Sequence, residues 1–178
     1  MPELIRHPNS PAGAIRSVSA QATRTREGRL ALSYQLHGEL DSVIVPPPSR
    51  ARIGWKLWRH TCCEAFIAAK GAQAYHEFNF SPSGEWAAYG FGRYREGASL
   101  DDAALDPQIA VERRTGRLEL YALVDLARLA PAHRQGPLRL GLAVIVEEES
   151  GAYSYWALRH APGKPDFHHA DAFALELA

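Results

Sequence analysis

The segment YHEFNFSPSGEW, residues 75 to 86, combines an acid, an amide and a histidine with aromatic side chains. Side chains alternate between the two faces of a β-strand, so Tyr75, Glu77 and Asn79 share one face. His76 lies on the other face, together with the phenylalanines. If the phenylalanines pack in the interior, Glu77 and Asn79 point outward. Their carboxylate and amide groups could then hydrogen-bond a small ligand.

Other aromatic and polar residues could complete a site of the kind that binds sugars. Flat aromatic rings stack on the apolar face of a pyranose, and carboxylate, amide and guanidinium groups bind its hydroxyls. Besides the three residues on the outward face, the candidates are Trp58, Glu64, Trp86, Arg93 and Trp156. Gly90 and Gly92 leave space on one face of the next strand, so we expect a groove with these glycines as its floor and Trp86 as its wall.

Glu64 has two interpretations that the sequence leaves open. It could bind ligand, or it could be a buried acid paired with Arg93 or Arg159 in a sandwich that binds nothing. A glycosidase needs two carboxylates roughly 5 to 9 Å apart, a spacing that Glu64 and Glu77 on adjacent strands could meet. The sequence has no GxSxG, HExxH or phosphate-binding glycine loop. Binding without catalysis is therefore the favoured hypothesis.

The segment RHAPGKPDFHHAD, residues 159 to 171, is rich in histidine and aspartate. Prolines and a glycine favour a rigid loop, and binding groups often lie on such loops. His160, Asp166 and His168 are therefore further ligand-binding candidates. Imidazole and carboxylate groups also bind divalent ions, so a metal-dependent hydrolase that uses this loop with Glu64 or Glu77 is an alternative. In a third interpretation the histidines only hold the loop in place.

The elements that must position these residues are predicted to be strands. Leucines and a tyrosine alternate over residues 30 to 36 after a turn at Glu27-Gly28, and residues 61 to 96 contain three strands joined by tight turns. Further hairpins are expected around Thr115-Gly116 and Ser150-Gly151, and the segment from 124 to 137 is expected to hold one short helical turn. This pattern predicts an all-β fold, an antiparallel β-sandwich of about ten strands, immunoglobulin-like or jelly-roll-like.

Composition narrows the function classes. The 178 residues suit a single domain, and 20 basic residues balance 20 acidic ones, so we expect neither a nucleic-acid nor a membrane partner. The adjacent Cys62 and Cys63 are expected to be reduced, one facing the core and the other facing solvent or a loop. The first residues are too polar for a secretory signal, so a cytoplasmic location is expected.

Three blocks of the sequence, LWRHTCCEAFI (57 to 67), YHEFNFSPSGEWAAYGFGRYREG (75 to 97) and SYWALRHAPGKPDFHHADAFALEL (154 to 177), resemble the bacterial DOMON-like proteins. This group is related to the ligand-binding DOMON domains and to carbohydrate-binding module family 9. The order of Trp58, Glu64, Tyr75, Glu77 and Phe78, followed by Pro82 and Gly84, is similar to the sugar-binding branch. The resemblance implies an immunoglobulin-like β-sandwich with a small ligand on its curved face or at its loop end.

Another branch of the resembling families binds haem through a methionine and a histidine. The only methionine here is Met1, so that scheme is not expected, although haem binding through two histidines stays an alternative. We expect no cofactor and a small-molecule ligand, with a sugar as the favoured class. The sequence does not predict an oligomeric state.

Overall fold

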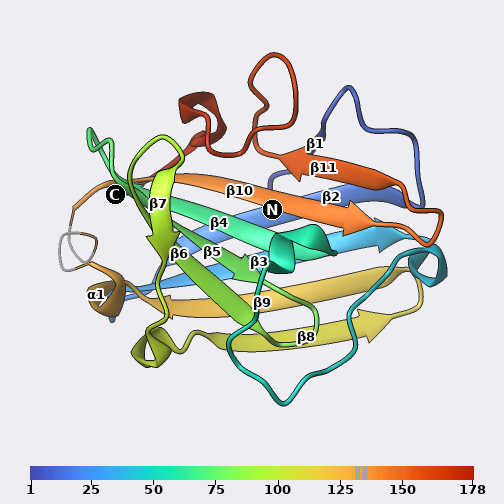
Figure 1. Ribbon diagram of the computed structural model, residues 1–178, viewed down its shortest axis with the longest axis horizontal. Coiled ribbons are helices and arrows are strands. Elements are labelled where there is room, and N and C mark those ends of the chain that lie inside the picture. Colours follow the sequence, from blue (N-terminus) through green and yellow to red (C-terminus); the bar gives the residue numbers. More distant parts are fainter. Residues whose placement is uncertain (131–132, 134–135) are drawn as a thin grey trace.

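A computed structural model describes residues 1–130, 133 and 136–178 (Figure 1). The described residues form twelve strands in two antiparallel sheets. The larger sheet runs in the order β1 (Ile5–Arg6), β11 (Tyr153–Ala157), β10 (Leu138–Glu147), β4 (Cys62–Ala69), β5 (Tyr75–Phe80), β6 (Trp86–Arg93) and β7 (Glu96–Ser99), and β12 (Leu175–Leu177) also pairs with β10. The smaller sheet runs in the order β2 (Ile15–Arg24), β3 (Arg29–Gly38), β9 (Arg117–Asp125) and β8 (Gln108–Arg114).

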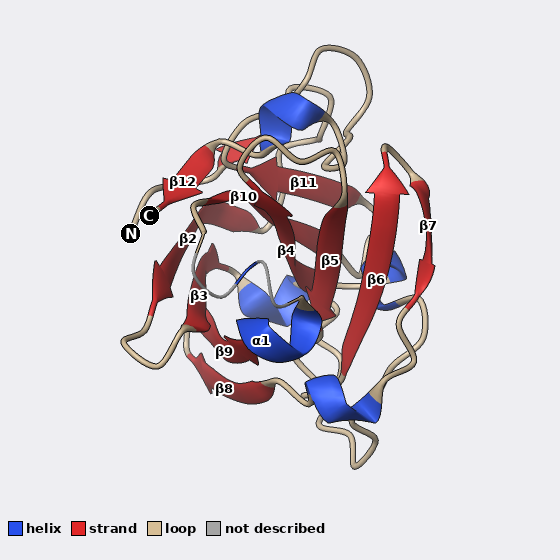
Figure 2. Cartoon of the chain, turned by 90° about the vertical axis from the view of Figure 1, so that its left-hand side faces the viewer, coloured by secondary structure: helices blue, strands red, loops and turns tan. Residues whose placement is uncertain are grey.

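The two sheets lie face to face around a shared apolar interior, which confirms the predicted β-sandwich (Figure 2). The short helix α1 (Leu126–Leu129) lies at one end of this interior, within the segment where a helical turn was expected. Four 3-10 turns complete the described elements: Leu40–Ser42, Leu57–Arg59, Ala103–Leu105 and Ala170–Ala172.

In the central strands, successive side chains alternate strictly between the interior and the outer face of the larger sheet. Phe78 and Phe80 point into the interior between the sheets, as predicted, together with alternate residues of β4 such as Ala65 and Ile67. Tyr34 of β3 spans the interior, and its hydroxyl donates a 2.9 Å hydrogen bond to the backbone carbonyl of Glu64. This bond ties the smaller sheet to the strand that carries one of the candidate residues.

The larger sheet is also covered on its outer face. The residues that pack there as a second apolar cluster are Phe66, Ala68, Tyr75, Ala143, Ile145, Ala157, Phe167 and Phe173. Two of them, Phe167 and Phe173, come from the C-terminal segment, and the 3-10 turn Leu57–Arg59 lies over β4 and β5. Residues of β4 are therefore buried on both faces, and the site forms under this cover.

The hairpins around Glu27-Gly28, Thr115-Gly116 and Ser150-Gly151 are confirmed. Gly28 and Gly116 have φ angles of 76° and 72°, a left-handed conformation that glycine adopts without a steric cost. The sequence did not predict β1 or β7. β1 has only two residues, and the chain enters β7 through a turn at Tyr94 and Arg95 that contains no glycine, proline or asparagine.

Cys62 and Cys63 lie on opposite faces of β4, and both are free and buried. Cys63 packs in the interior, whereas Cys62 lies next to Asn79 on the outer face, with 3.9 Å between Sγ and Oδ1. Within the described part of the chain, no helix has the length and apolar character needed to cross a membrane.

Trp86 packs against Phe78 in the interior and is 1% exposed, whereas Trp55 on the loop before β4 is 71% exposed. We expect Trp86→Ala to lower the free energy of unfolding by about 3–5 kcal/mol, because it leaves a large cavity. Trp55→Ala should change it by less than about 0.5 kcal/mol. Urea unfolding of the two variants checks this, and equal effects would contradict the interior position of Trp86.

Candidate functional site

A pocket of about 660 Å³ opens on the covered outer face of the larger sheet. Strand residues form its floor: Glu64, Phe66, Glu77, Tyr89, Phe91 and Ile145. Loops and the sheet edge form its walls, with Trp58 and Arg59 from the 3-10 turn, Tyr153 and Tyr155 from β11, and Phe167 and His168 from the C-terminal segment. Its size lies within the usual range for a site that binds a small molecule.

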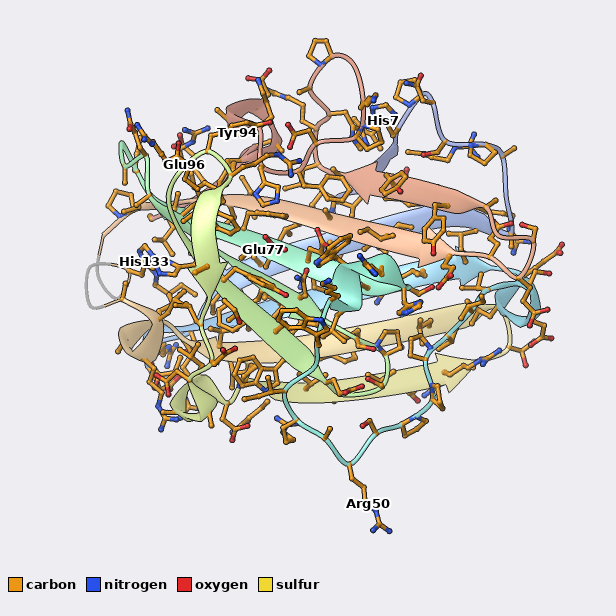
Figure 3. All side chains as sticks on the ribbon, in the orientation of Figure 1. His7, Arg50, Glu77, Tyr94, Glu96 and His133 are labelled. Carbon is orange, nitrogen blue, oxygen red and sulfur yellow. The ribbon has the colours of Figure 1, made fainter. Side chains whose placement is uncertain are left out.

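Glu64 and Glu77 lie together on the floor of this pocket. The register pairs Glu64 with Asn79 and Phe66 with Glu77 across β4 and β5, so the two acids project from neighbouring strands on the same face. Their side chains are almost entirely buried, with 3% and 5% exposure. Asn79 is fully buried beside them and donates a 2.9 Å hydrogen bond from Nδ2 to Oε1 of Glu77. Glu77 lies in the middle of the face shown in Figure 3.

Burial and mutual repulsion disfavour the charged forms of these acids. Burial raises the pKa of Glu77 to about 7, although the hydrogen bond from Asn79 and the charge of Arg95 act in the opposite direction. Burial, followed by the charge of Glu77, raises the pKa of Glu64 well above its usual range. Among the described residues, Glu64 forms no ion pair with an arginine. Arg93, one of the expected partners, pairs with Glu96 instead. The pocket floor therefore carries carboxyl groups that lack a counter-ion.

His168 connects the C-terminal segment to the floor. The hydroxyl of Tyr75 accepts a 3.0 Å hydrogen bond from the backbone N–H of Arg95 and lies 2.9 Å from Nδ1 of His168. A hydroxyl proton donated to Nδ1 would place the ring hydrogen on Nε2, which lies 3.6 Å from Oε2 of Glu77. Burial, aided by the charge of Arg95, lowers the pKa of His168 to about 4. The imidazole is therefore neutral at neutral pH and does not balance the charge of Glu77.

Asp166 organises the edge of the pocket. Its Oδ1 lies 2.8 Å from Nη2 of Arg95 and also accepts a 3.0 Å hydrogen bond from the backbone N–H of His168. The hydroxyl of Tyr94 donates to its other oxygen. The ion pair holds Arg95 at the pocket edge, so we assign Asp166 a positioning role for Arg95 and His168.

The opposite edge is aromatic and cationic. Trp58 is 43% exposed, and the guanidinium of Arg59 lies 5.4 Å from the centre of its ring. The hydroxyl of Tyr153 lies 3.0 Å from the backbone carbonyl of Arg59 and 2.7 Å from Oε1 of Glu147, which fixes the position of its ring. Trp58 is thus an aromatic face on the pocket that a ligand can reach from solvent.

The structure brings Trp58, Glu64, Glu77 and His168 into one pocket, with Tyr75, Asn79 and Asp166 in contact with these residues or their neighbours. Trp86 and Trp156 belong to the interior, so the prediction that Trp86 walls the site is wrong. Trp86 pairs with Phe80 on the neighbouring strand, and Trp156 pairs with Val144. Each tryptophan points to the same face of the sheet as its apolar partner.

The remaining predicted residues also lie elsewhere. Arg93 is at the exposed end of β6, beyond a register shift, where Nε lies 2.7 Å from Oε2 of Glu96. Nε2 of His160 lies 2.7 Å from the backbone carbonyl of Ile5, and His160 does not line the pocket. Gly90 faces Leu100 and His76 on the inner side of the sheet, so the expected glycine floor is also wrong.

The alternative of a metal site in the C-terminal loop is not supported by the geometry of the described residues. His160, Asp166 and His168 each contact different groups, and the described residues contain no cluster of three or more His, Cys, Asp or Glu side chains that could hold an ion. This removes the geometric basis for a hydrolase that uses a metal held by this loop.

Sequence reasoning missed several pocket residues: Arg59, Phe66, Arg95, Tyr153, Tyr155 and Phe167. Alternation alone would have found three of them, because Phe66 shares the face of Glu64, and Tyr153 and Tyr155 lie on the face opposite Trp156. Arg95 and Phe167 come from a turn and a loop, whose side chains follow no period. Only the folded chain places these two residues at the site.

A scan against models of known protein families and a search of curated protein sequences give no match. Among solved structures, the chain matches a crystal structure from Bacteroides uniformis described as a "putative carbohydrate-binding protein", with a TM-score of 0.68 and 16% identity. The match covers 96% of this chain and 81% of that one. The two proteins share a fold.

A carbohydrate-binding module of family 9 from Caldicellulosiruptor kristjanssonii, solved in complex with glucose, matches with a TM-score of 0.48 and 10% identity. That match covers 83% of this chain and 69% of the module. We base the shared fold on the Bacteroides uniformis structure.

The floor carboxyls predict an unusual dependence of stability on pH. A carboxyl whose pKa is higher in the folded than in the unfolded state stabilises the protein at low pH, and this stability is lost as the pH rises from its unfolded pKa of about 4.3 towards its folded value. Glu64→Gln removes one such group. The stability of the variant relative to wild type should therefore rise as the pH increases above about 4.3.

Urea unfolding at several pH values measures this difference. Glu119→Gln is the control, because Glu119 has little exposed surface but lies on the smaller sheet, where Arg117 and Tyr121 hold its carboxylate and its pKa is lowered. A stability difference between Glu64→Gln and wild type that stays constant over this pH range would contradict the raised pKa.

Proposed function

We propose that this protein binds a small carbohydrate in the pocket on the outer face of the larger sheet and performs no chemistry on it. The observation that carries this proposal is the combination of hydrogen-bonding carboxyls on the floor with aromatic side chains on the walls of one pocket. Glu64 and Glu77 are suited to bind sugar hydroxyls, and Trp58 is suited to stack on a sugar ring. The description of the Bacteroides uniformis protein, which shares this fold, supports the same class of ligand.

Binding fits this arrangement better than hydrolysis does. The two carboxyls of a glycosidase flank the bond that is cleaved, whereas Glu64 and Glu77 project side by side from adjacent strands of one floor. Asn79 also fixes one oxygen of Glu77 by a hydrogen bond. The resemblance to DOMON-like proteins accords with a binding role, and membership of that group is part of this proposal, as is a cytoplasmic location.

Calorimetric titration with a panel of mono- and disaccharides tests the proposal. At least one sugar should bind saturably, and Trp58→Ala should weaken its binding by about tenfold or more, as expected when an aromatic anchor is removed. The control is Tyr121→Ala, which removes an exposed aromatic ring from the outer face of the smaller sheet. This variant should bind as wild type does.

Two results would contradict the proposal. One is the absence of saturable binding to any sugar in the panel. The other is an unchanged affinity in Trp58→Ala, which would place the bound sugar outside this pocket.

A further inference from the structure

Glu64 is the most unusual group in the pocket. The residue is 3% exposed, and it lines the pocket. Within the described part of the chain, its carboxyl accepts no hydrogen bond and has no cation within ion-pair distance. Buried acids are almost always paired, because an unpaired charge loses its hydration without compensation. Glu64 therefore has no partner among the described residues, and a ligand could supply one.

In the part of the chain that the structure describes, Glu77 also has no positively charged group in direct contact with its carboxyl. Asn79 satisfies one oxygen with an amide donor, and the other oxygen faces the neutral ring of His168 at 3.6 Å. The other ionisable groups around the floor are the phenols of Tyr89, Tyr153 and Tyr155, together with the thiol of Cys62 beside Asn79. Each of these phenols and this thiol is either neutral or negative, so none adds a positive charge.

The two arginines that line the pocket are both occupied at its edge. Arg95 forms its ion pair with Asp166, at 2.8 Å, and also contacts the hydroxyl of Tyr94. Arg59 lies over the ring of Trp58. Neither arginine forms an ion pair with Glu64 or Glu77 among the described contacts. Among the described contacts, no ion pair therefore joins the acids of the floor to the arginines at the edge of the pocket.

The aromatic side chains around the floor favour a cation in the same position. Phe66, Tyr89 and Phe91 rise from the strands beside the two acids, and Tyr155 closes the β11 side. The faces of aromatic rings attract ammonium groups, and this attraction is stronger where water is excluded. A ligand that carries a positive charge would thus stabilise the ionised forms of both carboxyls, among these aromatic side chains. A neutral sugar would leave Glu64 without a charged partner.

We propose that the pocket selects sugars that carry a protonated amino group, with the ammonium bound between Glu64 and Glu77. This inference rests on the proposed function and names the chemical class of its ligand. The ammonium supplies three N–H donors, enough to reach both carboxylates. The sugar ring then extends towards Trp58, where its apolar face can stack.

Calorimetric titration at pH 7 with matched pairs of sugars tests this assignment. The pairs are glucosamine with glucose, galactosamine with galactose, and mannosamine with mannose, each with the N-acetylated sugar as a third member that keeps the nitrogen but not its charge. At least one amine should bind about tenfold or more tightly than both of its neutral counterparts, as expected for a charge-assisted hydrogen bond. This comparison uses the wild-type protein and does not depend on the folding of any variant.

Variants locate the effect. Glu64→Gln keeps the shape of the side chain and should reduce the affinity for the amine to about that for the neutral sugar. Glu119→Gln, the same change at a buried acid of the smaller sheet, should keep the full preference. An amine preference that persists in Glu64→Gln would overturn the assignment to this residue.

The outcomes separate the two proposals. If neutral sugars bind as tightly as their amines, the amino-sugar inference is wrong while carbohydrate binding stands. If none of these sugars and none of the wider panel binds saturably, both proposals fail.

Discussion

The carboxyl groups of Glu64 and Glu77 lie on a buried face of the larger sheet. The organisation of the site follows from the free-energy cost of burying them. Burying an ionised carboxylate costs several kcal/mol unless a partner compensates it. Here the compensation is partial: Asn79 donates one hydrogen bond to Glu77, and the charge of Arg95 acts in the same direction. The acids therefore stay protonated up to an unusually high pH, or they are charged and paired with a ligand. Neither state would be expected of a face that serves only to pack.

The rest of the fold supplies the stability that such a face does not. Interdigitating leucines, valines and aromatic rings fill the interior between the sheets, and Tyr34 anchors the backbone of β4 at Glu64. The C-terminal segment then covers the outer face. Its Phe167 and Phe173 pack against apolar residues of β4 and β10, and its His168 lies within hydrogen-bond distance of the hydroxyl of Tyr75. Asp166 fixes this segment to Arg95. The cover buries the two acids within the pocket, and Trp58 is the exposed aromatic residue among those that line it.

The sequence contained enough information to predict the sandwich, its main hairpins and the shared face of Glu77 and Asn79, because these follow from strand alternation and turn chemistry. It could not decide which tryptophans face the ligand. The sequence does not reveal the register of β6 against β5, and the pairing of Trp86 with Phe80 turns the tryptophan into the interior. Arg95 and Phe167 reach the pocket from non-periodic segments. His160 and His168 are eight residues apart in a proline-rich loop, but the fold directs them to different sides.

The central claim is that the pocket floor holds buried carboxyls without a counter-ion, and carboxyl carbon NMR measures this most directly. The side-chain resonances of Glu64 and Glu77 would be followed from pH 3 to pH 9 in the ligand-free protein and assigned with the Glu64→Gln and Glu77→Gln variants. We expect both groups to titrate above the usual glutamate range, with Glu64 clearly raised and Glu77 at about 7. If both groups titrate near 4.3, the usual glutamate value, the account is contradicted.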